Sequence, residues 1–272
     1  RRPVPAINMK KITSSDNEIY KSFARLYKRK HRDREGLYVI EGINLIEEAV
    51  KNGAELKSVF VRDDFDISAL ERITGGRKND VPAYMLSRAL FDKTADTETP
   101  QGIAAVSEKP ECSEQRFFDE TDDVIVLDRL QDPGNIGTVI RTADAAGFAG
   151  ALIVKGTADL FSPKTVRAAA GSLYRVRLLF AGSPEDAAEK LRAHGRQIIC
   201  TSPYAEKLFY DADMAHKTAL VIGNEANGVC EELQNAADVN VKLPMEGTIE
   251  SLNAAVAAAV VMYEAVRQRH MR

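Results

Sequence analysis

The stretch VIVLDRLQDPGNIGTVIRTADAAGFAGALIV (residues 124–154) encloses an alanine-rich segment between two short apolar runs. The runs at 124–127 and 151–154 have the length and the β-branched content of buried strands. Residues 136–146 have the apolar spacing of a helix, and the turn residues Pro133 and Gly134 precede it. A strand, a helix and a second strand in this order predict two parallel strands joined by a helical crossover.

The alternation of strand and helix continues from residue 154 to the end of the chain. Ser183 and Pro184 are typical of an N-cap and a first helical turn, and Gly195 marks the end of that helix. The apolar patterns predict strands at 176–180, 197–201, 219–223 and 239–243, and helices around 163–170, at 184–194 and at 251–268. The predicted fold class is α/β, with a mostly parallel sheet that helices cover on both faces.

A second alternating unit is predicted ahead of this one. Residues 15–18, SDNE, have the pattern of a capping box, and the helix after them has an apolar face. The unit is predicted to contain strands at 37–41, 57–64 and 101–108, and helices at 42–53, 67–76 and 87–94. The segment after it is polar and charged and contains a proline, which indicates a linker. We therefore expect one domain at 9–108, a linker at 109–122 and a second domain at 123–272.

The composition restricts the function classes. A chain of 272 residues that is 44% hydrophobic and 28% charged can bury a large core without disulfides or metals. The three cysteines and four histidines are scattered and form no CxxC or HExxH pair, so no disulfide framework and no metal site are expected. No apolar run of membrane-spanning length and no secretory signal is found, which predicts a cytoplasmic protein. Met9 is a candidate native start, which would make residues 1–8 an addition.

The net charge of −3 conceals an asymmetry. Residues 1–34 carry eleven Lys/Arg and three Asp/Glu, hence +8, and the rest of the chain carries −11. Such a basic segment on an acidic body favours a polyanionic partner that binds at one end. A solvated helix face explains the same run of charges equally well.

Three loops follow predicted strands of the second domain, and the carboxyl ends of parallel strands are where ligands bind in open sheets. They are DRLQDPGNIG after 124–127, GNEANG at 223–228 and PMEGTIESLN at 244–253. None contains a P-loop or a dinucleotide fingerprint, so a nucleotide hydrolase is disfavoured. Taken singly, each has an ordinary structural interpretation: Arg141 as a surface arginine, Glu225 in a tight turn, and Ser251 as an N-cap.

Taken together, DPGNIGTVIRTADAAGF, LVIGNEANGV and VKLPMEGTIESLNAAVAAAV resemble the three motifs of the SpoU (TrmH-like) family. These proteins are RNA ribose 2′-O-methyltransferases of the SPOUT class. The stretches REGLYVIEGINLIEEAV and ETPQGIAAV resemble the family's substrate-binding domain, which has an L30e-like fold. The resemblance covers nearly the whole chain after Met9.

The resemblance implies a methyltransferase domain with a parallel sheet and a trefoil knot, preceded by an RNA-binding α/β domain. It implies S-adenosylmethionine as the cofactor, a homodimer, and a ribose 2′-hydroxyl of structured RNA as the methyl acceptor. Ribosomal RNA, most simply 23S rRNA, is expected as the substrate, and the alternatives are tRNA or a non-catalytic RNA-binding protein of the same fold.

The resemblance also assigns residues to roles. The catalytic set is Arg141, Asn135, Glu225, Ser251 and Asn253. The cofactor-binding set is Thr201, Gly223, Asn224, Glu225, Gly228, Leu243, Met245, Ser251 and Leu252. For RNA binding, the basic run offers Lys28, Arg29, Lys30, Arg32 and Arg34, with Tyr20 and Tyr27 nearby for stacking.

Arg141 is the residue whose role most needs a physical explanation. An arginine side chain is always protonated, so it cannot readily act alone as a general base. We expect its planar fork to clamp the phosphate beside the target ribose and to stabilise charge that develops on the 2′-oxygen. We expect Asn135 to orient Arg141 or the ribose. Ser251 and Asn253 are expected to hold the RNA phosphate or the loop.

Overall fold

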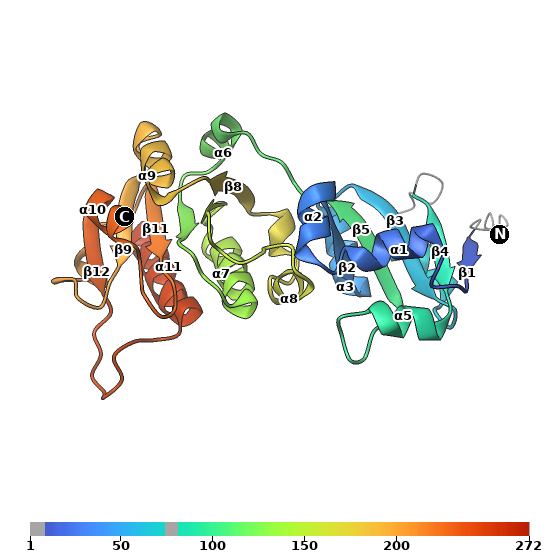
Figure 1. Ribbon diagram of the computed structural model, residues 1–272. Coiled ribbons are helices and arrows are strands. Elements are labelled where there is room, and N and C mark those ends of the chain that lie inside the picture. The colour runs from blue at the N-terminus through green and yellow to red at the C-terminus, as the bar shows by residue number, and fades with distance from the viewer. Residues whose placement is uncertain (1–8, 74–80, 272) are drawn as a thin grey trace. The chain divides into compact units, whose positions relative to one another are not determined.

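The computed structural model describes residues 9–73 and 81–271, which fold into two compact units (Figure 1). The first unit comprises the chain up to Pro110 together with Phe161–Arg167, and the second comprises Glu111–Leu160 and Ala168–Arg272. The question of an addition at residues 1–8 lies outside the described residues. A short segment of the second half of the chain is therefore part of the first unit, which the predicted boundaries did not include.

The first unit contains a mixed five-stranded sheet in the order β1-β4-β3-β5-β2. Strands β2 and β3 each pair antiparallel with β5, whereas β4 pairs parallel with both β1 and β3. The strands are β1 Lys10–Ile12, β2 Leu37–Glu41, β3 Leu56–Arg62, β4 Ala83–Leu86 and β5 Ile103–Glu108. The predictions for β2, β3 and β5 are confirmed. Strands β1 and β4 were not predicted because three or four residues are too few to show a period.

The helices of the first unit are α1 Glu18–Arg25, α2 Arg29–Glu35, α3 Ile43–Lys51, α4 Ile67–Ile73 and α5 Arg88–Thr94. Asn17, not Ser15, caps α1, because its Oδ1 accepts hydrogen bonds from the amides of Ile19 and Tyr20 at 2.9 and 3.3 Å. The predicted capping box is therefore wrong by two residues. The part of the predicted helix at 67–76 that follows Ile73 lies outside the described residues.

Aromatic side chains form the core of the first unit. Phe60 of β3 stacks on Phe23 of α1, with ring centroids 4.1 Å apart, and on Tyr84 of β4. Phe161 belongs to the inserted segment that leads into α8 (Pro163–Ala168). Its ring lies against that of Tyr38, with the two ring centroids 5.0 Å apart. Phe161 is only 3% exposed, so its burial explains why this segment packs with the first unit.

The second unit contains a seven-stranded parallel sheet in the order β10-β12-β9-β11-β6-β7-β8, which confirms the predicted α/β class. Its strands are β6 Val124–Leu127, β7 Gly150–Val154, β8 Arg177–Ala181, β9 Gln197–Thr201, β10 Lys207–Leu208, β11 Thr218–Ile222 and β12 Val239–Lys242. All described strands except the two-residue β10 were predicted. Their near-continuous burial is typical of strands covered on both faces.

Helices cover both faces of this sheet. Alternate strand residues such as Val124 and Val126 face a core that contains Phe117 and Leu191, whereas α7 and α11 pack together and cover the other face. The helices are α6 Glu114–Glu120, α7 Pro133–Ala146, α9 Pro184–Ala193, α10 Glu231–Ala236 and α11 Ala254–His270, with 3-10 turns η1 Ser172–Tyr174 and η2 Phe209–Asp211.

Two local predictions in the second unit are wrong. The expected linker at 109–122 contains α6, which Ser113 caps and which buries Phe117 and Phe118 in the core. Asn253, not Ser251, caps α11, since its Oδ1 accepts from the amides of Ala255 and Val256. A seven-residue helix with two adjacent aromatic residues gives too weak a period to separate it from a polar linker.

Candidate active site

Four strands that are neighbours in the sheet, β12, β9, β11 and β6, end at the same edge. Because all four run parallel, the loops that follow them meet at that edge. The three motif loops follow β6, β11 and β12, and Thr201 is the last residue of β9. The sheet order thus gathers segments that lie up to 118 residues apart in the chain, the separation of Asn135 and Asn253.

Glu225 connects the loop after β11 to the start of α7. Its carboxylate accepts hydrogen bonds from the amides of Gln131 and Asp132 at 3.1 and 3.2 Å, and from Asn135 Nδ2 at 3.1 Å. Partial burial would raise the pKa of Glu225, but the Asn135 amide and the two backbone donors outweigh burial and hold the pKa below its ordinary value. Glu225 is therefore a carboxylate at neutral pH and holds the two loops together.

Asn135 extends this connection to the third loop. Its Oδ1 accepts from Asn253 Nδ2 at 2.9 Å, while Asn253 Oδ1 caps α11. A single chain of hydrogen bonds, Asn253 to Asn135 to Glu225, therefore joins all three motif loops. The structure brings together three of the five predicted catalytic residues.

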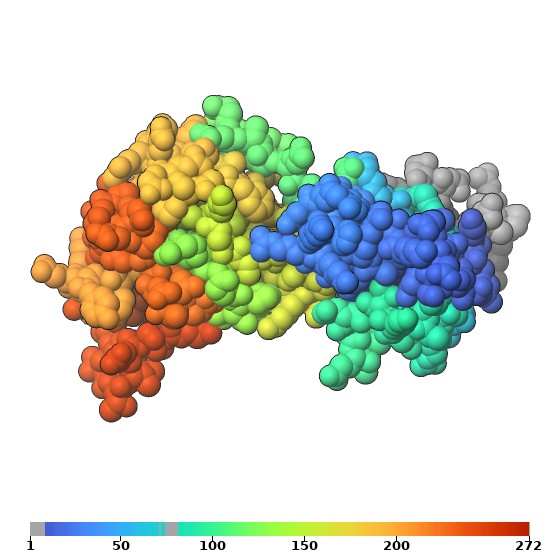
Figure 2. All heavy atoms as spheres, viewed as in Figure 1, coloured from blue at the N-terminus to red at the C-terminus, as the bar shows by residue number. Residues whose placement is uncertain are grey.

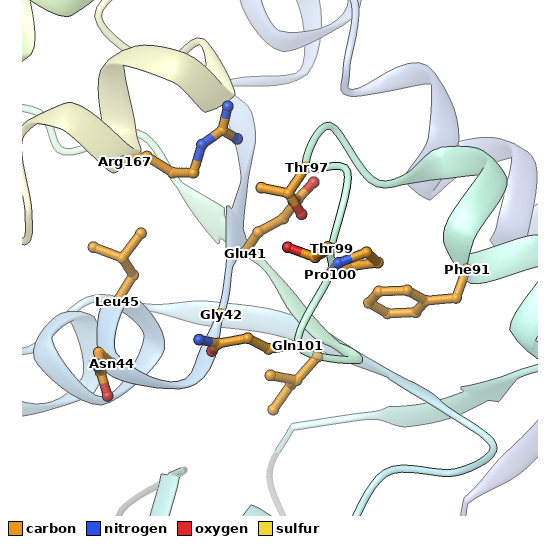
Figure 3. Close-up of a pocket in the computed structure, with 11 residues that line it drawn as sticks. Glu41, Gly42, Asn44, Leu45, Phe91, Thr97, Thr99, Pro100, Gln101 and Arg167 are labelled. Carbon is orange, nitrogen blue, oxygen red and sulfur yellow. The ribbon is translucent and has the colours of Figure 1, made fainter.

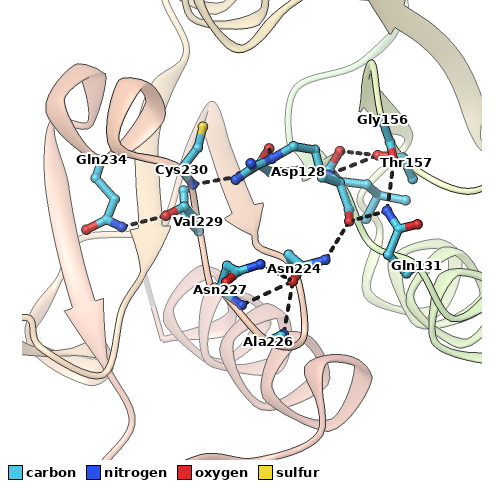
Figure 4. Close-up of polar contacts among 12 residues, drawn as sticks. Asp128, Gln131, Gly156, Thr157, Asn224, Ala226, Asn227, Val229, Cys230 and Gln234 are labelled. Carbon is cyan, nitrogen blue, oxygen red and sulfur yellow. Dashed lines mark hydrogen bonds and ion pairs between the residues drawn. The ribbon is translucent and has the colours of Figure 1, made fainter.

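The loop at 223–228 has a fixed backbone shape. The amides and carbonyls of Asn224 and Gly228 pair with each other at 3.0 and 2.8 Å. A Cβ on Gly223 would lie 2.1 Å from the Gly228 carbonyl carbon, so only glycine fits at position 223. Figure 4 shows Asn224 Oδ1 accepting from Ala226 and Asn227. This turn leaves Glu225 at its exposed tip.

A set of hydrogen bonds that was not predicted from the sequence supports the loop after β6, and we call it the brace (Figure 4). Arg129 adopts φ 58°, and its carbonyl accepts from both Gln131 Nε2 and Asn224 Nδ2, at 2.8 and 3.0 Å. Gln131 Nε2 also donates to the Gly156 carbonyl at 2.8 Å. Such a φ is uncommon for a side-chain-bearing residue and requires support of this kind.

Asp128, the first residue after β6, fixes the same loop from its buried side. Its carboxylate is fully buried and accepts from Arg129 Nε at 2.8 Å and from the Cys230 amide at 2.7 Å. An acidic residue directly after a buried strand was the available sequence signal, because a buried carboxylate requires partners.

Arg141 differs from the arginines around it. It is exposed on α7, six residues after Asn135, and about 9 Å further along the helix axis. Within the described residues it makes no hydrogen bond and no ion pair, whereas Asp144 on the same helix is paired with Arg175 at 2.8 Å. The folded chain therefore leaves Arg141 available for an anionic ligand.

The remaining predicted cofactor residues are less constrained. Thr201 donates to the Val221 carbonyl at 3.1 Å and is half-buried. Leu243 and Met245 are half-buried, whereas Ser251 and Leu252 are exposed. Residues 244–252 make no hydrogen bond to any other described residue. Figure 2 shows this loop, coloured orange-red, standing out from the second unit.

The basic run in the first unit is more complex than predicted. Arg32 is only 4% exposed and donates to the Leu26 carbonyl at 2.7 Å, so its predicted RNA contact is wrong. Arg29 pairs with Asp33, and Arg34 with Glu35. Lys28 and Lys30 are exposed and make no ion pair within the described residues.

The two tyrosines near this run differ in how far their rings are buried. Tyr20 is buried, and its hydroxyl contacts Thr94 Oγ1 at 2.7 Å. The Tyr27 hydroxyl donates to Glu41 at 2.6 Å. The predicted stacking role is wrong for Tyr20, whose ring belongs to the core.

Cysteine chemistry and metal binding find little support in the part of the chain that the structure describes. There, no group of three or more His, Cys, Asp or Glu side chains is arranged to hold a metal ion. Burial raises the pKa of Cys230 to about 12 and that of Cys200 higher still, so both remain neutral thiols. Among the described helices, none is both long and apolar enough to cross a membrane.

Comparison with known proteins agrees with this geometry. Residues 122–263 match the SpoU rRNA Methylase family, and residues 17–105 match the MRM3-like substrate binding domain. The chain is 36% identical to a 23S rRNA (guanosine(2553)-2′-O)-methyltransferase of Bacillus subtilis, over 94% of this chain and 98% of that protein. It is 34% identical to a 23S rRNA (uridine(2479)-2′-O)-methyltransferase of Streptomyces viridochromogenes, over 96% and 93%.

A solved structure gives the same result. The chain superposes on the AdoMet-bound rRNA methyltransferase from Sinorhizobium meliloti with a TM-score of 0.85 and 30% sequence identity, covering 95% of this chain and 98% of that one. Both units of the present chain therefore have counterparts in a protein that binds the cofactor.

Proposed function

The chain belongs to the SpoU rRNA methylase family, and we propose that it transfers the methyl group of S-adenosylmethionine to a ribose 2′-hydroxyl of 23S rRNA. The observation that carries this proposal is the hydrogen-bonded chain Asn253–Asn135–Glu225, with the unpaired Arg141 on the same helix as Asn135. The relatives that act on 23S rRNA align with both units, which favours this substrate over tRNA. The intact polar set disfavours a non-catalytic protein.

The chain's residues fit S-adenosylmethionine, which when bound supplies a methyl group on an electrophilic sulfonium centre. Adenine requires backbone donors and apolar walls, and the loops after β9, β11 and β12 offer both. Leu252 and Ile249 are 36% and 58% exposed in a loop whose backbone has no hydrogen-bond partner in the described part of the chain, so a ligand would complete their packing. We assign the cofactor to Thr201, Gly223, Asn224, Glu225, Gly228, Leu243, Met245, Ser251 and Leu252.

The role of Arg141 follows from its having no partner among the residues that the structure describes. A guanidinium that is already paired would have to break that pair to bind RNA, whereas Arg141 pays no such cost. Its fork suits a phosphate, and its charge lowers the free energy of a developing 2′-alkoxide nearby. Asn135 holds the start of α7 in register with Glu225, and Ser251 is free to contact the RNA backbone. Positioning dominates such a reaction.

The proposed homodimer rests on an apolar stripe. On α11, Val256, Val260 and Tyr263 are 49%, 39% and 51% exposed, and their spacing places them on one helix face. Val261, on the same helix, is buried in the subunit's own core and does not belong to this stripe. Because α11 packs against α7, a second copy on this stripe would lie near the helix that carries Arg141. We also propose that the methyltransferase domain of this chain contains the trefoil knot of the family.

The first unit would grip the RNA through the cations that remain exposed. These are Lys28, Arg29, Lys30 and Arg34, whereas Arg32 instead anchors α2 to the Leu26 carbonyl. Contacts to phosphate from surface lysines and arginines are sensitive to salt, so binding by this unit should weaken as salt concentration rises.

The proposed function is tested with purified protein, labelled S-adenosylmethionine and transcripts of 23S rRNA and tRNA. We expect label in 23S rRNA that appears, after digestion to nucleosides, in one 2′-O-methylnucleoside. Label in a base, label in tRNA alone, or no transfer despite cofactor binding in calorimetry would each contradict the proposal. The last result would identify a non-catalytic RNA-binding protein.

A further inference from the structure

The first unit contains a pocket of about 320 Å³ that is separate from the three motif loops (Figure 3). Glu41 at the end of β2 and Leu45 on α3 form one side, and the loop from Thr97 to Gln101 forms the other. Arg167 of α8 completes the wall. The volume lies within the range of small-ligand sites, about 300–1,000 Å³.

Glu41 fixes the shape of this pocket. It is 8% exposed, and its carboxylate accepts from the Tyr27 hydroxyl at 2.6 Å, the Asp96 amide at 2.9 Å and Thr97 Oγ1 at 3.3 Å. Burial and the neighbouring carboxylate hold the pKa of Tyr27 well above its usual range, so its hydroxyl remains a donor. With its lone pairs largely occupied, Glu41 orders the wall and is not itself the main ligand contact.

Gln101 presents an oriented donor. Its Oε1 accepts from the Ile43 amide at 2.8 Å, which determines which end of the side-chain amide is the oxygen. The Nε2 group is then the end available to a ligand. Gly42 supports this arrangement, because a Cβ there would lie 3.1 Å from Gln101 Oε1 and its φ is +97°.

The two terminal nitrogens of the Arg167 guanidinium differ in their hydrogen bonding. Its Nη2 is 2.5 Å from Asp96 Oδ2, whereas Nη1 is buried and has no hydrogen-bond partner among the described residues. A buried donor without a partner destabilises the fold, and an acceptor supplied by a ligand at this position would remove that loss. In Figure 3, Arg167 comes from a helix, whereas Thr99 and Gln101 come from one loop on the other side of the pocket.

We propose that this pocket receives one unpaired nucleobase of the RNA substrate, distinct from the methylated nucleotide. The proposal rests on the proposed function, since the base belongs to the rRNA that the enzyme methylates. Arg167 Nη1, Gln101 Nε2 and the Thr99 hydroxyl donate to carbonyl oxygens of the base, and Leu45 and Pro100 pack against its face. Sequence-specific RNA recognition uses unstacked bases in this way.

The charge balance favours a base over a phosphate. Among the described lining residues Arg167 is the one cation; it is paired with Asp96, and Glu41 lines the same pocket as a carboxylate, so these described groups carry no excess positive charge. A phosphate would meet two carboxylates, whereas a neutral base presents only dipoles. Arg167 thus becomes a specificity residue that lies in the methylase part of the sequence, within 122–263, but in the first unit of the fold.

Three conservative variants test the pocket in the full-length protein. Arg167→Lys keeps the charge beside Asp96 but removes the fork, Gln101→Glu keeps the acceptor for Ile43 but removes the donor, and Thr99→Val removes one hydroxyl. Thr13→Val is the control, because Thr13 is exposed outside the pocket.

Steady-state methyl transfer to a 23S rRNA transcript is the first readout. We expect KM for RNA to rise about tenfold in Arg167→Lys and Gln101→Glu, and about threefold in Thr99→Val, since each variant removes one hydrogen-bonding contact to the base. The kcat at saturating RNA and the Kd for S-adenosylmethionine should stay unchanged, as should all constants of Thr13→Val. A KM within twofold of wild type in both Arg167→Lys and Gln101→Glu overturns the proposal.

Crosslinking of the wild-type protein to transcripts that contain 4-thiouridine or 6-thioguanosine is the second readout. We expect one nucleotide to crosslink to the peptide that contains residues 97–101. Crosslinks confined to other peptides overturn the proposal. Wild-type methyl transfer judges the proposed function separately, because the crosslink reports on the pocket even if 23S rRNA is not methylated.

Discussion

Two loops at the same edge of the parallel sheet differ sharply in how the folded chain holds them. The loop after β6 is braced through Glu225, Gln131 and Asp128, and it even sustains a positive φ at Arg129. Residues 244–252, after β12, make no hydrogen bond within the described chain until Asn253. Preorganised groups stabilise a transition state without reorganisation, whereas a segment with few contacts can order around a ligand. We infer that the braced loop is the catalytic platform and the open loop is the cofactor clamp.

The largest effect is expected at Arg141, the exposed arginine on α7. Arg141→Lys keeps a positive charge but loses the bidentate fork, so methyl transfer should fall at least about 100-fold. The Kd for S-adenosylmethionine should remain within about twofold in calorimetry, because Arg141 is not assigned to the cofactor loops.

Arg116→Lys provides the matched control for this variant. Arg116 is also exposed, but it is paired with Glu120 at 2.8 Å on α6. Its substitution should leave turnover unchanged. Equal activity of the two variants would show that an unpaired arginine on α7 has no special role.

The second effect concerns the hydrogen bond from Asn135 to Glu225. Asn135→Asp is isosteric and can still accept from Asn253, but it places an oxygen 3.1 Å from the Glu225 carboxylate where a donor stood. We expect kcat/KM to fall about tenfold and the free energy of unfolding by about 1 kcal/mol, because the site is exposed. Thr138→Ala, one turn further along the same face, is the control. Wild-type kinetics in Asn135→Asp would show that the hydrogen bond from Asn135 to Glu225 does not contribute to methyl transfer.

The third prediction concerns the open loop. Hydrogen exchange of the amides at 244–252 should be fast in the free protein and should slow several-fold with saturating S-adenosylmethionine, since a ligand would order them. Two amides that bond to carboxylates of the braced loop, those of Asn135 on Asp132 and Cys230 on Asp128, should already be protected. Equal protection of both loops before ligand is added would remove the distinction between platform and clamp.

The smallest effect concerns pH. Because the folded-state pKa of Glu225 is lowered, its contribution is fully present above the unfolded value of about 4.3 and is lost as pH falls through the folded pKa. The stability difference between wild type and Glu225→Gln should therefore be constant from about pH 6 to 9 and should shrink below about pH 4. The measurement is thermal melting of both proteins across this pH range. A stability difference that grows as the pH falls below about 4 would contradict the lowered pKa of Glu225.

The fold could be predicted from the sequence wherever an element is long or buried enough to show its period. The strand at 124–127 and the helix after it have continuous apolar patterns, whereas β1 and α6 offer three and seven residues. The insertion of Phe161 into the first unit was invisible, because an apolar residue before a helix does not say which core it enters.

The candidate site was predictable only in part, for a related reason. Asn135, Arg141 and Glu225 stand in motifs that can be recognised, but the contact from Asn253 to Asn135 depends on sheet order, which spacing does not encode. Burial of Arg32 also depends on tertiary packing, since its neighbours in sequence are all charged or polar. The brace at Gln131 and Gly156 is set by a backbone turn at Arg129 that no propensity predicts.

The contact between Asn135 and Asn253 is where platform and clamp meet, and a double-mutant cycle tests it most directly. Asn253→Ser can still cap α11, but its shorter side chain cannot reach Asn135, and Asn135→Ala removes the acceptor. If the two loops form one methyl-transfer site, kcat/KM of the double variant will match that of the more damaged single variant, within about twofold. Losses that multiply, as for independent sites, would contradict the account.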